Sequence, residues 1–151
     1  MSTRTTLAEL PSLKGQPLGV SEWFEITQQR VNTFADATDD HQWIHVDVER
    51  ASRQSPFGGP IGHGFLTLSL FVPMWSQVLV VTDAGMIVNY GLNKVRFPSP
   101  VPVDSRVRAT FEVLELDEQD WGGQATLRAT VEREGGDKPV CVAEIIFRHY
   151  R

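Results

Sequence analysis

The hydrophobic pattern changes period along the chain, and this change limits the possible folds more than any other feature. Residues 65–81 are almost continuously apolar, but the run contains Pro73 and Gln77 and falls short of the ~18–20 residues of a membrane-spanning helix. We therefore predict a buried core helix there. Residues 105–113 and 124–133 instead alternate apolar with polar side chains, which predicts two half-buried strands.

Turn residues connect the predicted strands into a meander. Residues 121–123 (Trp-Gly-Gly) separate the two alternating segments, and residues 135–137 (Gly-Gly-Asp) lead to a last strand over residues 139–150. Residues 86–97 add one or two more strands, which closely spaced prolines terminate. The length fits one domain over residues 1–151. The expected fold class is α+β, with a curved antiparallel sheet wrapped around the long apolar helix.

The segment before the apolar run is predicted to be helical and irregular. Thr27 is suited to cap a helix that ends near residues 39–40, and Asp47 to cap a short helix over residues 48–54. Residues 55–64 are so rich in glycine and proline that no regular element continues through them. They form a shaped loop that runs directly into the apolar helix. The inward face of the first helix is predicted from spacings of three and four residues to contain Val31, Phe34, Ala35 and Thr38.

Composition excludes several classes of partner and compartment. Fourteen Lys and Arg against nineteen Asp and Glu give a net charge of −5, so the chain has no overall electrostatic signature of nucleic-acid or anionic-membrane binding. The single cysteine, Cys141, cannot form an internal disulfide. The first residues lack the apolar core of a secretory signal. We expect a cytoplasmic protein with neither nucleic-acid nor membrane partners.

The ionisable residues crowd into one region. An aspartate and a histidine five positions apart, Asp40 and His45, stand at a helix exit close to the glycine-rich loop. Such a pair can hold a water molecule, because the carboxylate accepts one proton and the imidazole gives or accepts another. An imidazole titrates near neutral pH, with a reference pKa of ~6.5. The whole cluster comprises Asp39, Asp40, His41, His45, Asp47 and His63.

Other interpretations of these residues stay open at this point. Asp39 and Asp40 also suit a helix end followed by a turn, and Asp47 suits a helix cap better than a catalytic role. His41 and His45 are spaced as in the zinc motif HExxH, but Gln42 replaces its glutamate and spacing identifies no third ligand. We therefore expect no metal. Nucleophilic roles for Ser69 and Cys141 are disfavoured, since neither lies in a nucleophile-elbow motif.

Two long runs resemble a known enzyme family. Residues 34–70 (FADATDDHQWIHVDVERASRQSPFGGPIGHGFLTLSL) resemble the signature of the MaoC-like hydratases, the (R)-specific enoyl-CoA hydratase or hydratase 2 family. Residues 89–109 (NYGLNKVRFPSPVPVDSRVRA) resemble its nodulation-protein-N-like branch. The resemblance implies the hot-dog fold, a sheet wrapped around a long helix, and a homodimer in which the two sheets join.

The resemblance also implies an activity and the residues that carry it. Asp40 and His45 match a dyad that activates water for addition to a trans-2-enoyl thioester, giving the (R)-3-hydroxyacyl product without a metal or organic cofactor. Gly64 matches the residue whose N–H stabilises negative charge on the thioester carbonyl, where a helix N-terminus favours an anion. His63 precedes it in the same motif and is expected to shape the loop. The expected substrate is an acyl-CoA thioester.

The chain departs from the family pattern next to the dyad. Asp39 stands where relatives commonly have glycine, and Gln42-Trp43 stands where they commonly have Asn-Pro. The extra carboxylate either raises the pKa of Asp40 or points to solvent. Gln42 can still offer an amide to the water or to Asp40. Trp43 is bulkier than proline and is expected to narrow the acyl pocket.

Substrate contacts are less specific in the sequence. Phe65, Leu68 and Tyr90 are candidates for an acyl tunnel, with core packing as the favoured alternative. The phosphates of coenzyme A require cations, for which Lys94, Arg96, Arg106 and Arg108 are available. Alternating arginines also suit the solvated face of a strand, so the sequence does not choose among them.

Two other functions remain as alternatives. Within the same fold, the chain suits a thioesterase that hydrolyses acyl-CoA. It also suits a non-catalytic module for acyl-CoA binding or dimerisation. The Asp40–His45 spacing and the Gly-His-Gly sequence of residues 62–64 favour the hydratase.

Overall fold

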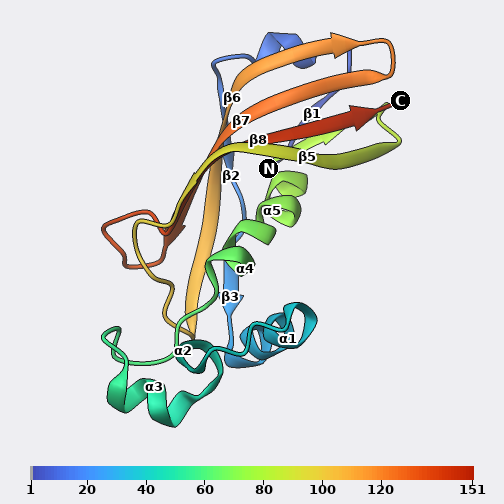
Figure 1. Cartoon of the computed structure of the whole chain (residues 1–151). Helices are drawn as coiled ribbons and strands as arrows, with labels where there is room; N and C mark the ends of the chain where they lie inside the picture. The colour runs from blue at the N-terminus through green and yellow to red at the C-terminus, as the bar shows by residue number, and fades with distance from the viewer. Residues whose placement is uncertain (1) are drawn as a thin grey trace.

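One curved antiparallel sheet forms the frame of the molecule. The computed structural model describes residues 2–151, and its six-stranded sheet has the order β2–β6–β7–β8–β5, with β3 also pairing with β6. Figure 1 shows the sheet bending around the central helices. This arrangement confirms the expected α+β class. The strands are β2 (Pro17–Val20), β3 (Phe24–Ile26), β5 (Met86–Arg96), β6 (Ser105–Gln119), β7 (Gly122–Arg133) and β8 (Cys141–Tyr150).

The apolar run lies against the concave face of this sheet as two consecutive helices, α4 (Gly64–Ser69) and α5 (Phe71–Val78). The Trp75 ring on α5 packs against Phe111 of β6 with centroids 5.2 Å apart. The helix is interrupted at Leu70 because Pro73 has no N–H to continue the ladder and crowds the preceding turn. Among residues 2–151, no helix is both long and apolar enough to span a membrane.

The prediction of one helix through residue 81 is wrong at its C-terminal end. Residues Leu79–Val81 form a strand, β4, which pairs in parallel with β1 (Thr3–Thr5). β-branched valines favour extended backbone, and β1 comes from the far N-terminus of the chain. Apolar content alone could not separate this strand from the helix before it.

The hairpin between β6 and β7 turns at residues 120–121, earlier than predicted, and Gly122 and Gly123 already belong to β7. Gly122 has φ +151°, and a Cβ there would lie 1.8 Å from the carbonyl oxygen of His149. The glycine is therefore required by the close approach of β8. The alternating segments do form the predicted strands, and residues 86–96 form one strand rather than two.

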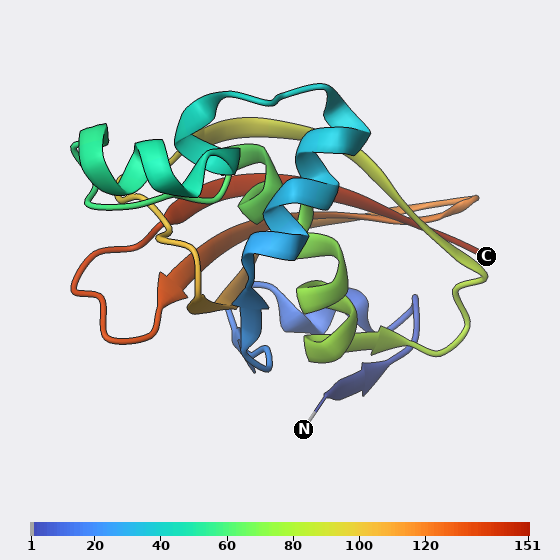
Figure 2. The ribbon, with the colours of Figure 1, turned by 90° about the horizontal axis from the view of Figure 1, so that it is seen from below.

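The helices before α4 follow the prediction closely. Thr27 caps α1 (Gln28–Thr38) by accepting from the Arg30 N–H at 3.1 Å, and Asp47 caps α3 (Val48–Gln54). A short helix, α2 (Trp43–Val46), lies between them. Thr38 is exposed, so its predicted place on the inner face is wrong. The three helices lie at the lower end of the sheet in Figure 1, the end from which Figure 2 views the molecule.

The N-terminal strands β1 to β3 and the 3₁₀ helix Leu10–Leu13 were not predicted. Each has only three or four residues, which is too short for a hydrophobic period to emerge.

Candidate active site

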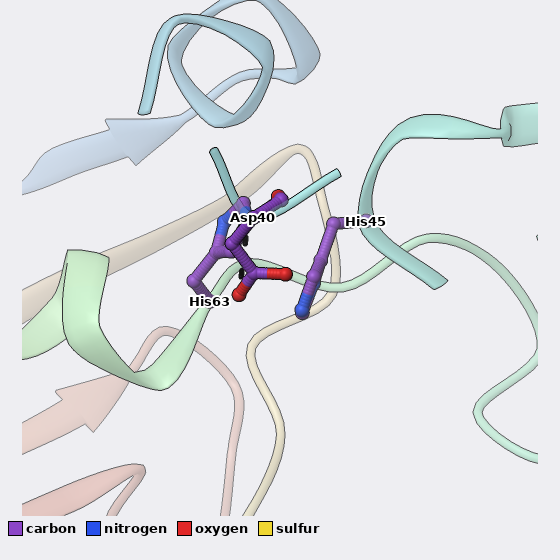
Figure 3. Close-up of side chains that lie close together, drawn as sticks. All are labelled: Asp40, His45 and His63. Carbon is purple, nitrogen blue, oxygen red and sulfur yellow. Dashed lines mark hydrogen bonds and ion pairs between the residues drawn. The ribbon is translucent and has the colours of Figure 1, made fainter. Parts of the chain in front are cut away.

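Three side chains from separate parts of the chain meet at the helical end of the sheet. Asp40 follows α1, His45 lies in α2, and His63 ends the glycine-rich loop before α4. One polar atom from each side chain lies within 4.8 Å of the corresponding atom of the other two. Figure 3 shows the three side chains together. The predicted pair, Asp40 and His45, is thus brought together, with His63 as a third member.

His45 is held in one tautomer. Its ring is buried, and Nδ1 lies 2.7 Å from the Ile61 carbonyl oxygen. Since a carbonyl can only accept, Nδ1 carries the proton and Nε2 keeps a free lone pair. The pKa of His45 is lowered, chiefly because burial disfavours the imidazolium and also because His63 is close, although the Ile61 bond and Asp40 oppose the shift. His45 is therefore a neutral base at neutral pH.

Backbone contacts fix the position of this imidazole. The Gln28 amide on α1 donates to the His45 carbonyl at 2.8 Å. The Ile61 N–H donates to the Ile44 carbonyl at 3.0 Å, and the Gly62 N–H donates to Val101 at 2.8 Å. The loop is thus tied both to α2 and to the segment after β5. A sequence pattern could not reveal the roles of Gln28 and Ile61, because both act through long-range hydrogen bonds.

His63 joins the two dyad residues. Its ring is 3% exposed and stacks on the ring of His45, with centroids 3.8 Å apart and planes inclined by 25°. Its Nε2–H donates to the backbone carbonyl of Asp40 at 3.0 Å. Phe34 on α1 packs on the same ring, with a centroid distance of 4.9 Å. His63 thus contacts both members of the predicted pair, in addition to its place in the loop.

The Asp40 carboxylate remains accessible, with 49% of its side chain exposed. Asp39 ends α1 in the left-handed conformation, with φ 59°, and this turn directs the chain toward α2. The Asp39 side chain is exposed. The Gln42 N–H approaches a carboxylate oxygen of Asp40 at 3.4 Å, and the Gln42 side chain is exposed at the start of α2. Solvent or substrate can therefore reach the dyad from this side.

Gly64 begins α4, so the helix contains no carbonyl one turn earlier to accept its N–H. The ring of Phe97 packs so closely that a Cβ on Gly64 would lie 3.2 Å from three of its carbon atoms. The absence of a side chain at Gly64 therefore leaves room for the Phe97 ring.

Of the three acyl-tunnel candidates, two line one cavity. Leu68 and Tyr90 border a space of about 500 Å³ between the central helices and β5. Phe65 is 69% exposed and packs edge-on against Phe97, with centroids 6.4 Å apart, instead of lining that cavity. The other lining residues are Ser69, Phe71, Val72, Asn89, Gly91, Leu92, Ile145 and Phe147.

Several alternative interpretations of single residues are removed by their contacts. His41 is exposed and pairs with Asp36 at 2.8 Å, so it does not join His45 in a zinc motif. The Ser69 hydroxyl donates to the Phe65 carbonyl within the helix. Cys141 is buried, and burial raises the pKa of its thiol to about 12, so it is not a nucleophile. Residues that could hold a metal are Asp40, His45 and His63, although each imidazole has one nitrogen bonded to a backbone carbonyl.

Known proteins with similar sequences show which family this chain belongs to. Residues 9–142 match the family profile described as a MaoC like domain. The chain belongs to the MaoC-like family. It is 52% identical over 150 residues to 3-hydroxyacyl-thioester dehydratase Z of Mycobacterium tuberculosis, with 99% of each chain covered. It is 47% identical over 146 residues to nodulation protein N of Rhizobium leguminosarum bv. viciae, covering 93% of this chain and 89% of that relative.

Solved structures give the same result for the fold. The (R)-hydratase of A. caviae matches with a TM-score of 0.73 and 27% identity, covering 90% of this chain and 96% of that chain. The resemblance read from the sequence and the hot-dog fold it implied are therefore confirmed. This MaoC-like protein is a hydratase or dehydratase, and its reaction class is that of a hydro-lyase.

Proposed function

We propose that this MaoC-like protein is an (R)-specific enoyl-CoA hydratase. It adds water to a trans-2-enoyl-CoA to give the (R)-3-hydroxyacyl-CoA and catalyses the reverse dehydration at the same site. The observation that carries the proposal is the meeting of a neutral imidazole Nε2 with an accessible carboxylate beside a helix start.

The dyad supplies the water chemistry. A water molecule between Asp40 and His45 donates one hydrogen to the carboxylate and the other to His45 Nε2. As the water oxygen bonds to C3 of the enoyl group, His45 takes the proton, and the C2–C3 double bond becomes an enolate. The dyad then returns one proton to C2 on the same face, so that the elements of water are added and the dyad is restored.

Gly64 stabilises the negative charge that develops on the substrate away from C3. During attack, negative charge accumulates on the thioester carbonyl oxygen, and a backbone N–H aimed at this oxygen stabilises the transition state more than the substrate. The Gly64 N–H at the start of α4 is suited to this role. His63 positions the dyad, and Gln42 lies at its accessible side, where its amide can contact the thioester.

A second copy of the chain completes the enzyme. Among residues 2–151, strand β5 pairs with β8 and with no other strand, and its exposed residues include Ile87, Val88 and Tyr90. A long apolar edge strand favours pairing with another strand, and a two-fold pair of β5 strands would join two sheets. The acyl cavity reaches this same edge through Tyr90 and Leu92. The dimer would therefore close the pocket that takes the acyl chain.

The test is hydration of crotonyl-CoA, followed as loss of the enoyl-thioester absorbance, together with a free-thiol assay and chiral analysis of the product. Asp40→Asn and His45→Gln are expected to lower kcat by about 100-fold or more, the usual contribution of acid–base groups. Asp39→Asn and His41→Gln are matched controls, because both side chains are exposed close to the dyad in the chain. Both controls are expected to retain activity.

The alternatives give different results. Release of free thiol would favour the thioesterase. Binding of acyl-CoA with neither hydration nor thiol release, across several chain lengths, would favour the binding module. An (S) product would contradict the proposed stereochemistry while leaving the hydro-lyase class intact.

The proposed dimer is tested separately, by light scattering and by activity. Replacing both Ile87 and Val88 with glutamate on β5 is expected to convert dimer to monomer in light scattering and to lower activity. Val20→Glu on β2, the opposite edge of the sheet, is the control, since Val20 is also exposed. A wild-type monomer with full activity would contradict the proposed dimer.

A further inference from the structure

Two cations on the outer face of β5 lack the carboxylate partners that neighbouring arginines have. Arg106 and Arg108, on the same face of the sheet, form ion pairs with Glu134 and Glu132. Within residues 2–151, Lys94 and Arg96 have no carboxylate at ion-pair distance, and one guanidinium nitrogen of Arg96 donates only to the adjacent Val95 carbonyl.

The strand register explains this difference for Arg96, while Lys94 lacks an ion pair although a carboxylate lies opposite it. Glu112 on β6 lies opposite Arg128 on β7, and the two are paired at 3.1 Å. Lys94 lies opposite Glu144 on β8, whereas Arg96 lies opposite Val142. The Arg96 guanidinium thus retains most of its donors for a ligand.

Both cations border a small hollow. It has a volume of about 230 Å³ and is lined by Lys94, Arg96, Arg128, Val142, Ala143 and Glu144. Three cations and one carboxylate, Glu144, thus surround this hollow in a chain whose net charge is −5. Because Arg128 is bound to Glu112, Lys94 and Arg96 are the cations free to bind an anion.

The hollow lies on the outer face of the sheet, where β5 ends and the chain continues toward the place proposed for the thioester. Arg96 is followed by Phe97, whose ring packs on Gly64. A second cavity of about 400 Å³ is lined by Gly64, Phe97 and Val140, among others. Val140 is only two residues before Val142 in the basic hollow. A chain-like substrate that reaches Arg96 from Gly64 passes Phe97 and the end of β5, because the helix α4 lies on the concave face of the sheet and the hollow on its outer face.

We infer that Lys94 and Arg96 bind the phosphate at the end of the pantetheine arm of the thioester substrate. This inference rests on the proposed function, which places the thioester carbonyl at Gly64. The planar guanidinium of Arg96 suits bidentate binding of a phosphate, and the Lys94 ammonium adds a point charge. Coenzyme A and a carrier protein present the same phosphate on this arm. Both side chains project from the face of β5, so pairing of its edge with a second copy leaves them available.

Kinetics with graded substrates tests the inference. The variants are Arg96→Gln and Lys94→Gln, with Arg108→Gln as the matched control from the same face. For crotonyl-CoA and for crotonyl-phosphopantetheine, we expect KM to rise about tenfold in Arg96→Gln, the effect of one charge-assisted hydrogen bond, with kcat nearly unchanged. For crotonyl-pantetheine, which has no phosphate, KM should be the same in wild type and variants. Wild-type KM for the two phosphorylated substrates should also rise with salt.

Each possible result of these kinetic measurements supports or overturns the inference. An equal rise of KM for crotonyl-pantetheine, or no rise for the phosphorylated substrates, would overturn the inference. A rise for crotonyl-CoA alone would assign the cations to the nucleotide and overturn the pantetheine-phosphate site. Equal losses with a crotonyl-carrier protein would show that both carriers use it. If wild type hydrates none of these thioesters, the proposed function fails, and calorimetric binding of phosphopantetheine to wild type and Arg96→Gln still decides the phosphate site.

Discussion

The Ile61 carbonyl accepts the Nδ1 proton of His45 at 2.7 Å, and this one bond determines which nitrogen of His45 is free. The free nitrogen, Nε2, belongs to a ring that burial and the neighbouring His63 keep neutral. A residue of the glycine-rich loop therefore sets the chemistry of a residue in α2. The same loop continues into His63 and Gly64, so one segment connects the base, its positioning residue and the helix start.

The pH dependence of hydration should report His45. Its pKa lies below the ordinary 6.5, and the base is active only when neutral. We expect kcat/KM to persist below pH 6.5 and to fall as the pH decreases through the lowered pKa. In His63→Gln the amide can still donate to the Asp40 carbonyl, but the neighbouring imidazole is lost, so the acid limb should move to higher pH. His41→Gln should leave it in place. An acid limb that stays unmoved in His63→Gln would remove His63 from the tuning of His45.

Asp39 offers a test of backbone strain beside the dyad. Its φ of 59° is left-handed, a conformation that costs most L-residues about 1–2 kcal/mol and glycine almost nothing. Asp39→Gly should raise the free energy of unfolding by up to about 1 kcal/mol in urea titrations, since aspartate tolerates this region better than most residues. Asp39→Ala should lower it. Activity should change little in either variant, and a destabilised Asp39→Gly would contradict the strain.

His149 should make the fold sensitive to acid. It is fully buried on β8, where Trp75 Nε1–H donates to its Nε2 at 3.5 Å. Burial lowers its pKa from 6.5 to about 4. A folded-state pKa below the unfolded value means that the unfolded chain binds the proton first. This stability is therefore complete above pH 6.5, and roughly 3 kcal/mol is lost by about pH 4.

Urea unfolding from pH 7.5 to pH 4.5, followed by tryptophan fluorescence, measures this effect. His149→Gln should show a shallower loss of stability with acid than wild type. NMR titration of His149 in wild type provides an independent reading if the variant fails to fold. A His149 pKa near 6.5 would contradict the prediction.

Periodic features of the fold were readable from the sequence, and features that depend on distant contacts were not. The alternating strands, the Thr27 and Asp47 caps and the glycine-rich loop each carry a local signal, and all were predicted. The sequence predicts helix over strand β4, because the partner of this strand, β1, is more than seventy residues away.

The candidate site likewise combines features with a local sequence signal and features that depend on distant contacts. The spacing of Asp40 and His45 drew attention to the pair. In contrast, the stacking of His63 on His45 and the bond from Gln28 to the His45 carbonyl depend on how three segments meet. The sequence also left four cations equivalent as phosphate ligands. Only the ion pairs of the folded chain distinguish Arg106 and Arg108 from Lys94 and Arg96.

Substitution of Gly64 tests whether this residue serves catalysis or packing. In Gly64→Ala the new methyl group meets three carbon atoms of the Phe97 ring at 3.2 Å. The ring must move, at a cost of about 1–2 kcal/mol in unfolding free energy. The methyl group also stands beside the N–H proposed to bind the thioester oxygen, so kcat/KM should fall by about tenfold or more.

The double variant Gly64→Ala with Phe97→Leu is the control for packing. It relieves the crowding, because leucine is smaller than phenylalanine and the Phe97 ring is partly exposed. Its stability should match that of Phe97→Leu, while its kcat/KM stays well below that of Phe97→Leu. Recovery of both quantities together would mean that Gly64 serves packing alone and that another donor stabilises the enolate.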